Sequence, residues 1–375
     1  MQTDTGIDTH NVITIGQAET IIEKSVQAIL ENPAMARLLP PVMLRSAPGC
    51  GKSSVVKAVA DKLGIGFIDI RLAEMEPVDL RGLPVPNHES KSVQWYVTAD
   101  LPRNPDSKGI ILFDELTSAP KDMQVAAYEL ILDRRLGSLY KIPDGWFIVA
   151  AGNRVKDKAV ATTMSSALAN RMMHFEIDAD AAEWGAWAVS KGLHPSVTGY
   201  IAYRPACLLK MDQNLEAGWP SPRSWERVSH VIRLFDDEET VRKVVYGLVG
   251  PAVGCEFMEF HKINRNFGSV LKMLTDPNEP VVIPDRADEK YALASAVSYL
   301  LWNGKNAEDE AARLEGLFRI ISKLPDDFAA MLVKNASMGN PRVPRVKAVL
   351  KLAKTKGYKE YQAKYEAEKA SRGLV

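Results

Sequence analysis

The chain has 375 residues, more than one average domain, which predicts two or three units with a substantial buried core. Hydrophobic residues make up 46% and charged residues 25%, as in an ordinary globular protein, and Lys plus Arg equal Asp plus Glu at 47 each. The overall charge therefore gives no indication of a nucleic-acid or membrane partner, and any such sign must be local.

The three cysteines, Cys50, Cys207 and Cys255, are widely separated, which argues against a disulfide framework or a zinc site and fits a reducing compartment. The first ten residues, MQTDTGIDTH, lack the basic and apolar regions of a signal peptide. No stretch approaches the ~18 apolar residues of a membrane-spanning helix. We therefore expect a cytoplasmic protein that is not integral to a membrane.

Residues 16–177 alternate amphipathic helical patterns with short apolar runs, which is typical of a parallel sheet covered by helices. The expected helices span 21–30, ending before Pro33, and 53–63. The expected strands are 42–44, 66–70, 109–113, 146–151 and 172–177. We interpret residues 1–177 as one α/β domain with the sheet sandwiched by helices.

Residues 76–106 are rich in proline and charge and too long for a simple connection, so they are either functional or disordered. After residue 178 helical patterns dominate, at 180–191, 195–203 and 222–234. Residues 342–372 carry ten Lys or Arg against three Glu, a local net charge of +7. Two interpretations of this basic segment stay open, a solvated amphipathic helix and a tail that docks a partner or a polyanion.

The sequence SAPGCGKS, residues 46–53, follows an apolar strand and opens a helix, the context that a phosphate-binding loop requires. Gly49 and Gly51 let backbone N–H groups point at phosphate oxygens, Lys52 reaches the β- and γ-phosphates, and the Ser53 hydroxyl ligates Mg²⁺. Ser46 stands where such loops usually begin with glycine, so we expect a slightly different backbone there. A glycine-rich turn without a ligand is the alternative. The candidate nucleotide-binding residues are Ser46, Ala47, Pro48, Gly49, Cys50, Gly51, Lys52, Ser53 and Ser54.

Two adjacent carboxylates, Asp114 and Glu115, end the apolar run ILFDE, 62 residues after Lys52. Asp114 is the second candidate ligand for Mg²⁺, and Glu115 is the candidate for orienting and deprotonating the water that attacks the γ-phosphate. Such a pair alone is usually a solvated strand end. After a phosphate-binding loop at this distance, it predicts a catalytic site.

Three further polar residues are candidates for the same site. Asn153 ends the apolar run WFIVAAGN, although Asn is otherwise a common turn residue. Arg171 precedes the last expected strand, and Arg223 lies at a helix start where Ser221 can cap and Pro222 fits the first turn. Either arginine is otherwise a surface cation; as a catalytic group it would meet the developing negative charge of the nucleotide.

The chain resembles AAA+ ATPases in five motifs that occur in the same order: SAPGCGKS, ILFDEL, AAGN, ALANRM and SPRSW. The chain is also similar to the MoxR branch of that family in the segments EPVDLRGLP, DELTSAP, AYELILDRRLG, PDGWFIVAAGNR and SPRSWE. The resemblance covers about residues 14–235.

This resemblance implies that Asn153 is the first sensor, Arg171 the arginine finger that reaches the neighbouring subunit's site, and Arg223 the second sensor. It thereby implies a ring, usually a hexamer, that binds ATP and Mg²⁺. Residues 178–275 would be a helical lid and 276–375 a helical extension. The insert 76–106 would lie near the ring pore, with residues 78–83 touching a client or partner. Arg134 and Arg135 are interpreted either as subunit-interface residues or as part of a solvated helix.

The first functional hypothesis is an ATPase that remodels or activates a protein client, with a partner that carries a von Willebrand factor A domain. The second is a nucleic-acid or defence-associated motor, supported only by the basic segment. A third is a nucleotide-gated scaffold without useful turnover, against which Glu115 and Arg171 both argue.

Overall fold

We analysed a computed structural model that describes residues 11–137, 139–154, 157, 164, 166–211, 217–263, 267–304 and 308–371. The first ten residues, on which the signal-peptide prediction rests, lie outside the described residues. The chain divides into two compact units, Met1–Ala179 and Asp180–Val375, and each is described by itself.

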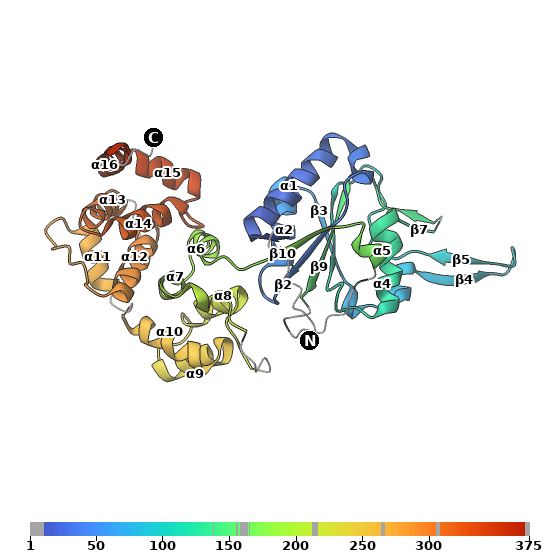
Figure 1. Cartoon of the computed structure of the whole chain (residues 1–375), viewed down its shortest axis with the longest axis horizontal. Coiled ribbons are helices and arrows are strands. Elements are labelled where there is room, and N and C mark those ends of the chain that lie inside the picture. Colours follow the sequence, from blue (N-terminus) through green and yellow to red (C-terminus); the bar gives the residue numbers. More distant parts are fainter. Residues whose placement is uncertain are drawn as a thin grey trace, which may run out of the picture. The chain divides into compact units, whose positions relative to one another are not determined.

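The first unit is built on a six-stranded sheet with the order β1-β10-β2-β9-β6-β3 (Figure 1). All neighbouring pairs are parallel, and Val42 of β2 lies between Val149 of β9 and Met173 of β10. The predicted parallel sheet is confirmed, with an additional short strand at one edge. The strands are β1 (Val12–Ile13), β2 (Val42–Ser46), β3 (Gly66–Arg71), β6 (Gly109–Asp114), β9 (Trp146–Asn153) and β10 (Met173–Ile177).

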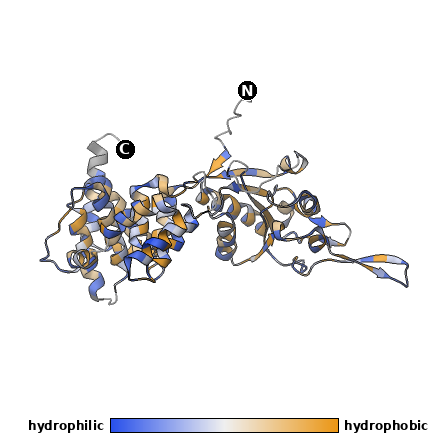
Figure 2. Cartoon of the chain, turned by 90° about the horizontal axis from the view of Figure 1, so that it is seen from below, coloured by the Kyte–Doolittle hydropathy of each residue, from blue (hydrophilic) through white to orange (hydrophobic). Residues whose placement is uncertain are grey.

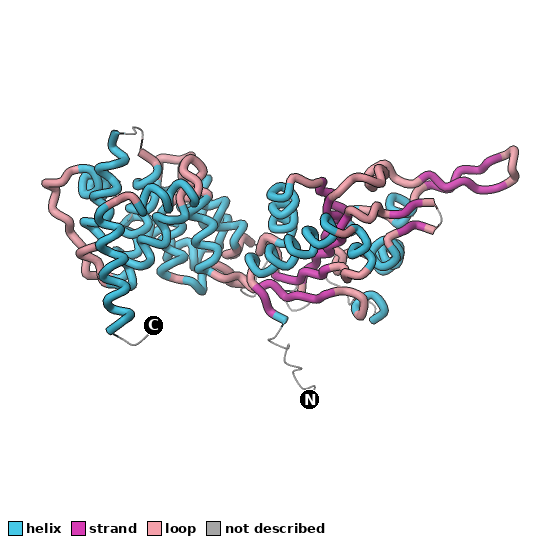
Figure 3. The backbone as a smooth tube through the Cα atoms, turned by 90° about the horizontal axis from the view of Figure 1, so that it is seen from above, coloured by secondary structure: helices cyan, strands magenta, loops and turns pink. Residues whose placement is uncertain are grey.

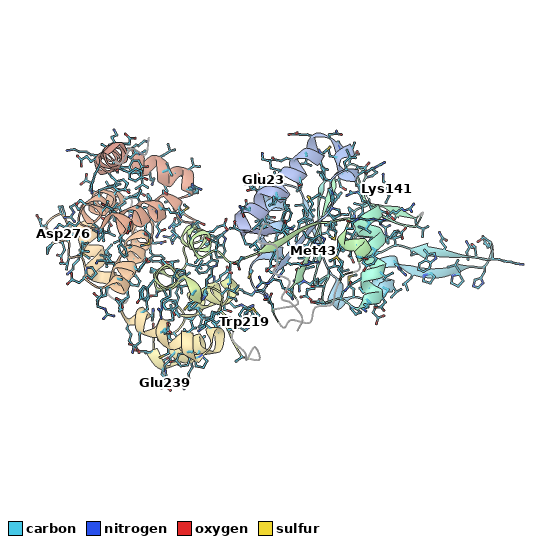
Figure 4. All side chains as sticks on the ribbon, in the orientation of Figure 1. Glu23, Met43, Lys141, Trp219, Glu239 and Asp276 are labelled. Atoms are coloured by element: carbon cyan, nitrogen blue, oxygen red, sulfur yellow. The ribbon has the colours of Figure 1, made fainter. Side chains whose placement is uncertain are left out.

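Successive side chains of the central strands point into two separate helical layers, as the two-residue period of a strand requires. Leu44 and Val149 pack against α1 (Ile15–Glu31) and α2 (Lys52–Leu63) in one apolar cluster. Met43, labelled in Figure 4, and Ile148 pack on the opposite side with α4 (Lys121–Tyr128). The predicted sandwich of a sheet between helices is therefore confirmed.

Local signals in the sequence explain where the first helix begins and ends. Thr14 and Gln17 form a capping box at the start of α1, and Asn32 ends it directly before Pro33. Asn32 in turn caps the 3₁₀ helix η2 (Pro33–Arg37). Further short elements of this unit are η3 (Leu72–Glu74), the π-helical turn η4 (Glu129–Asp133) and α5 (Ser166–Ala169).

The insert 76–106 is structured and contains a helix, α3 (Pro77–Arg81), and an antiparallel hairpin of β4 (Leu83–Asn87) and β5 (Ser92–Tyr96). The hairpin projects from the sheet, and Figure 2 shows hydrophobic residues along it. No strand was expected in this segment, which is rich in proline and charge. β4 forms although it contains Pro84 and Pro86, residues that usually argue against a strand. A second small hairpin joins β7 (Arg135–Leu136) to β8 (Tyr140–Lys141).

The second unit is helical over its described residues, with no strand beyond the isolated bridge between Gly339 and Pro344 (Figure 3). Its described residues bury two neighbouring apolar regions: Tyr200, Trp225 and Phe257 pack ring against ring, and Leu301 and Leu317 lie in a larger cluster. No helix among the described residues is long and apolar enough to cross a membrane. The helices are α6 (Ala181–Ser190), α7 (Pro195–Tyr203), η6 (Pro205–Cys207), α8 (Pro222–Val231), α9 (Glu238–Val249), α10 (Pro251–Ile263), α11 (Phe267–Thr275), α12 (Ala287–Trp302), α13 (Glu308–Ile321), α14 (Asp326–Met338), α15 (Arg345–Ala353) and α16 (Lys356–Ser371).

The basic segment forms two helices, α15 and α16, so the expectation of one amphipathic helix is wrong. The chain leaves α15 at Lys354, and Thr355 begins the turn into α16. Tyr358 and Tyr361 of α16 pack against the larger apolar cluster of this unit, which anchors the helix. The first turns of α16 thus contribute to the core as well as to the surface.

Candidate functional site

The loop between β2 and α2 has the backbone of a phosphate-binding loop. Gly49 and Gly51 adopt φ angles of 79° and 94°, in the left-handed region that glycine alone enters without strain. Ser46, by contrast, is the last residue of β2 and pairs with Asn153 of β9 as ordinary strand. The serine therefore meets no positive φ, in agreement with its dislike of that region, and the slightly different backbone expected relative to a loop that begins with glycine stays a prediction.

The first turn of α2 is arranged to meet an anion. Gly51 is its N-terminal capping residue and brings no side chain to take the helix N–H groups. A helix N-terminus carries a partial positive charge, to which phosphate oxygens bind. Ser53 is half-buried and Ser54 exposed in this turn.

The Lys52 side chain is almost fully buried, with 8% of its surface exposed, and its Nζ lies among oxygen acceptors at the end of the sheet. Nζ donates to the Ser46 hydroxyl at 3.0 Å and to Oδ1 of Asn153 at 3.2 Å. The carbonyl oxygens of Ser46 and Ala47 both lie at 3.4 Å. Lys52 and Asn153, predicted from separate motifs, are thus brought together.

The two residues proposed to hold Mg²⁺ are also in direct contact, because the Ser53 hydroxyl donates to Oδ2 of Asp114. A hydroxyl and a carboxylate at one point are the hard oxygen ligands that Mg²⁺ prefers, with phosphate and water oxygens completing its shell. The chemistry of the donor set therefore fits the ion. The negative charge of Asp114 also reaches β3, where burial first and this charge second raise the pKa of Asp69.

Glu115 is held in an unusual backbone conformation at the end of β6, with φ at 57°. Its N–H donates to Oδ1 of Asp114 at 2.8 Å, and the next N–H, of Leu116, donates to the Ala151 carbonyl at 2.9 Å. These contacts keep a long side chain in the left-handed region at a cost of roughly 1–3 kcal/mol. Such strain at a strand end is typical of a residue whose side chain must point in one direction.

Asn153 is fixed by its connection to the loop that follows the neighbouring strand. Its N–H donates to the Thr117 hydroxyl at 3.0 Å, and that hydroxyl donates to the Asn153 carbonyl at 3.1 Å. Gly152 makes this close approach possible, because a Cβ there would lie 2.5 Å from Oγ1 of Thr117. The backbone of Asn153 is therefore held by Thr117, a residue that sequence reasoning missed although it lies inside the DELTSAP motif.

A second missed feature is a buried ion network that follows Asn153. Arg154 donates to both carboxylate oxygens of Asp157, at 2.6 and 2.9 Å, and to Glu176 of β10 at 2.7 Å. The side chains of all three are largely buried. In the sequence, only Arg154 itself, directly after the AAGN motif, could have indicated this network. Glu176 contacts it from another strand, which the sequence does not show.

Residues 41–174 match the family described as "ATPase family associated with various cellular activities (AAA)". This segment is an AAA-type ATPase domain. It spans the loop, both carboxylates, Asn153 and Arg171, and it does not extend into the helical unit.

Solved structures with a similar chain path are more distant than the family match. A mutant of RuvB from Thermotoga maritima is 17% identical, with 77% of this chain and 88% of that one covered and a TM-score of 0.40. NtrX of Brucella abortus is 11% identical, with 89% and 69% covered and a TM-score of 0.37. These values are too low to carry a functional argument, so the family assignment rests on residues 41–174.

Within the AAA domain, Arg171 does not lie beside Lys52. β10 begins at Met173, which pairs with Val42, the first residue of β2. Arg171 therefore lies beside the N-terminal ends of these two strands. Lys52, in contrast, comes after the C-terminal end of β2. The two ends of β2 are ~13 Å apart, at ~3.3 Å per residue. Arg171 is exposed there and lines a cavity of 410 Å³ together with Arg37 and Arg134.

Arg134 is buried, so the interpretation that it belongs to a solvated helix is wrong for it, while its place at a subunit interface stays a prediction. Its guanidinium is buried and donates to the carbonyls of Pro143 and Trp146 at 2.9 and 2.7 Å. Burial lowers its pKa below the ordinary value of an arginine. Arg135, in contrast, is exposed, and its Nε lies 3.6 Å from Oε1 of Glu129.

Arg223 belongs to the helical unit and is exposed in the first turn of α8. Ser221 caps this helix by accepting the Ser224 N–H at 3.1 Å, and Pro222 occupies the first turn. Both local predictions for the SPRSW motif are confirmed.

Cys50 is buried in the phosphate-binding loop with 5% of its surface exposed. Burial raises the pKa of its thiol, an effect that the nearby Lys52 charge only partly opposes. The thiol is thus protonated at neutral pH and a weak nucleophile.

Proposed function

We propose that this chain binds ATP with Mg²⁺ and hydrolyses it. The observation that carries the proposal is the convergence of two contacts, Lys52 with Asn153 and Ser53 with Asp114, on the turn that begins α2. Lys52 and the N–H groups of the loop hold the β- and γ-phosphates, while Ser53 and Asp114 hold the ion. Bound Mg²⁺ neutralises charge that develops on the phosphate oxygens.

Glu115 is the proposed general base of this site. It lies at the end of β6 with a strained backbone, and its neighbour Asp114 is in contact with Ser53. A carboxylate so placed orients a water and accepts its proton as the water attacks the γ-phosphate. Asn153 orients the same water or the γ-phosphate from the neighbouring strand.

The experiment that tests hydrolysis is Glu115→Gln in the full chain. We expect ATP binding to remain within about threefold of wild type and turnover to fall by ~100-fold or more, the usual size of a lost general base. Glu19→Gln, which removes an exposed carboxylate of α1, is the matched control and leaves turnover unchanged. Turnover that persists in Glu115→Gln would refute the assigned role.

We further propose that the active form is a ring of several copies, usually six in the family that the motifs resemble. Arg171 is the proposed arginine finger, supplied to the site of a neighbouring copy. Its exposure at the sheet edge remote from Lys52 of its own chain supports this, since a group there cannot serve its own loop.

The proposed role of the ring is that of a MoxR-like remodelling ATPase, which acts on a protein client in the cytoplasm with a partner carrying a von Willebrand factor A domain. Arg223 is the proposed second sensor, residues 178–275 the lid and 276–375 the extension. The support is the resemblance of the quoted motifs. A pull-down with Glu115→Gln tests it, because a stalled ATP state holds its client longest.

A nucleic-acid motor is the second candidate, favoured only by the basic helices α15 and α16. DNA-stimulated turnover that falls steeply between about 50 and 200 mM salt would support it. Absence of stimulation by single- and double-stranded DNA would leave the remodelling ATPase.

A further inference from the structure

We propose that Ser46 is a positioning residue for Lys52. The serine that stands in this loop in place of the usual glycine then has a function of its own. The inference rests on the proposed ATP site and adds a specific group to it. A glycine at position 46 would supply a carbonyl oxygen only, whereas serine adds a hydroxyl at the point where Nζ lies.

The hydroxyl of Ser46 is oriented by its own bonds. It donates to the Ala47 carbonyl at 2.8 Å, and a hydroxyl has a single hydrogen, so its lone pairs are left as acceptors. Nζ of Lys52 lies 3.0 Å from this oxygen, closer than to Asn153 or to either backbone carbonyl. The hydroxyl is therefore the nearest of these four oxygens to the ammonium.

Burial makes this contact consequential. Ser46 is fully buried and Lys52 nearly so, and a buried ammonium requires acceptors for its three N–H groups. The Ser46 hydroxyl is one of these acceptors, so it helps to hold Lys52 at the strand end.

The strand register fixes where Ser46 places the ammonium. Ser46 and Asn153 are paired residues on adjacent strands, so their side-chain oxygens approach Nζ from β2 and β9. Lys52 is therefore held between the strand that precedes the loop and the strand that ends in the proposed first sensor. Removing the hydroxyl takes away the shortest of these four contacts, and the position of Nζ becomes less defined.

Nucleotide affinity is the first measurement. In the full chain with Mg²⁺, we expect Ser46→Ala and Ser46→Gly to weaken binding of ATP and ADP by about tenfold to 100-fold, as the loss of a hydrogen bond to a charged group does. AMP affinity stays unchanged because Lys52 addresses the β- and γ-phosphates. Ser46→Thr keeps the hydroxyl and restores most of the ATP affinity. Ser46→Gly also keeps the test valid if Ser46→Ala does not fold, since glycine is the usual residue here.

The second measurement needs no nucleotide. The rate of acylation of Lys52 by an amine-reactive acetylating reagent, followed by peptide mass spectrometry, rises at least about threefold in Ser46→Ala if the hydroxyl holds Nζ. Ser25→Ala removes another hydroxyl of the same unit, bonded to the Ile21 carbonyl at 2.8 Å, and serves as the matched control with no change in either measurement.

The two measurements separate this inference from the proposed function. Unchanged acylation and unchanged ATP affinity in Ser46→Ala overturn the positioning role. Faster acylation in a protein whose wild type binds no ATP refutes the ATP site but supports the contact between Ser46 and Lys52. A loss of ATP, ADP and AMP affinity by the same factor would show a general structural defect and overturn the proposal.

Discussion

Nζ of Lys52 lies 3.2 Å from Oδ1 of Asn153, although 101 residues separate them in the chain. The contact exists because β2 and β9 are adjacent parallel strands that end side by side, with Ser46 opposite Asn153. In open parallel sheets, ligands bind at the carboxyl ends of the strands, and this contact lies there. It joins the residue proposed to bind the phosphates to the residue proposed to sense them.

The first prediction concerns Asn153. In Asn153→Ala we expect ATP turnover to fall by about tenfold or more, since a positioned polar group at the reacting phosphate is lost. ATP affinity should change less, because Lys52 keeps its contacts with Ser46 and Ala47. Steady-state turnover and equilibrium binding of a fluorescent ATP analogue measure both. Asn87→Ala, at the end of β4, is the control, and an equal loss in it would contradict the assignment.

The backbone strain at Glu115 gives a second prediction, on stability. Glycine relieves a positive φ that alanine does not, so Glu115→Gly should be about 1 kcal/mol more stable than Glu115→Ala. The midpoint of the transition that reports the α/β unit should differ by about 2–4 °C. Neither variant hydrolyses ATP. Equal midpoints would show that the strain at Glu115 is not stored in the folded chain.

Complementation between inactive subunits tests the proposed role of Arg171. Arg171→Ala and Lys52→Ala should each abolish turnover alone. When the two are mixed, some sites pair an intact loop with an intact finger from a neighbour, so a fraction of the activity returns. Arg37→Ala, a change of another exposed arginine at the same cavity, is expected to keep wild-type turnover. If mixing restores nothing while both variants still assemble, the finger does not act between subunits.

The helical unit should lose stability in mild acid because of His194. Its Nδ1 accepts the Ser196 N–H at 3.1 Å as the cap of α7, and the ring lies beside His261 and Phe267. Burial, with smaller contributions from His261 and Arg233, lowers its pKa from 6.5 to about 3. Between these values the unfolded chain binds a proton that the folded chain excludes, so stability falls as the pH drops from 6.5 toward 3.

The matched variant for this prediction is His194→Asn, which keeps a side-chain oxygen to cap α7 but does not titrate. Wild type should lose at most about 1.4 kcal/mol more per pH unit than the variant below about pH 6.5. Chemical unfolding followed at about pH 7.5, 6.0 and 5.0 measures the difference. Parallel pH dependences in the two proteins would exclude His194 as the source.

The sequence alone predicts the features that depend on neighbouring residues. Short apolar runs place the five longer strands of the sheet, and the loop from Ser46 to Ser53 is a local motif with its glycines at the left-handed positions. The caps at Thr14 and Ser221 are equally local, because each involves residues within one helical turn. Hence the α/β class and the candidate residues of the site follow from sequence.

Tertiary structure decides which of these residues meet and what they can do. The hairpin at 83–96 forms despite two prolines in β4, and Arg134 is buried because carbonyls from Pro143 and Trp146 surround it. Thr117 reaches Asn153, and Glu176 reaches Arg154, only across adjacent strands. Strand order and register are non-local, since a parallel neighbour is joined through a long crossover connection. They bring Lys52 to Asn153 and place Arg171 at the opposite edge of the sheet.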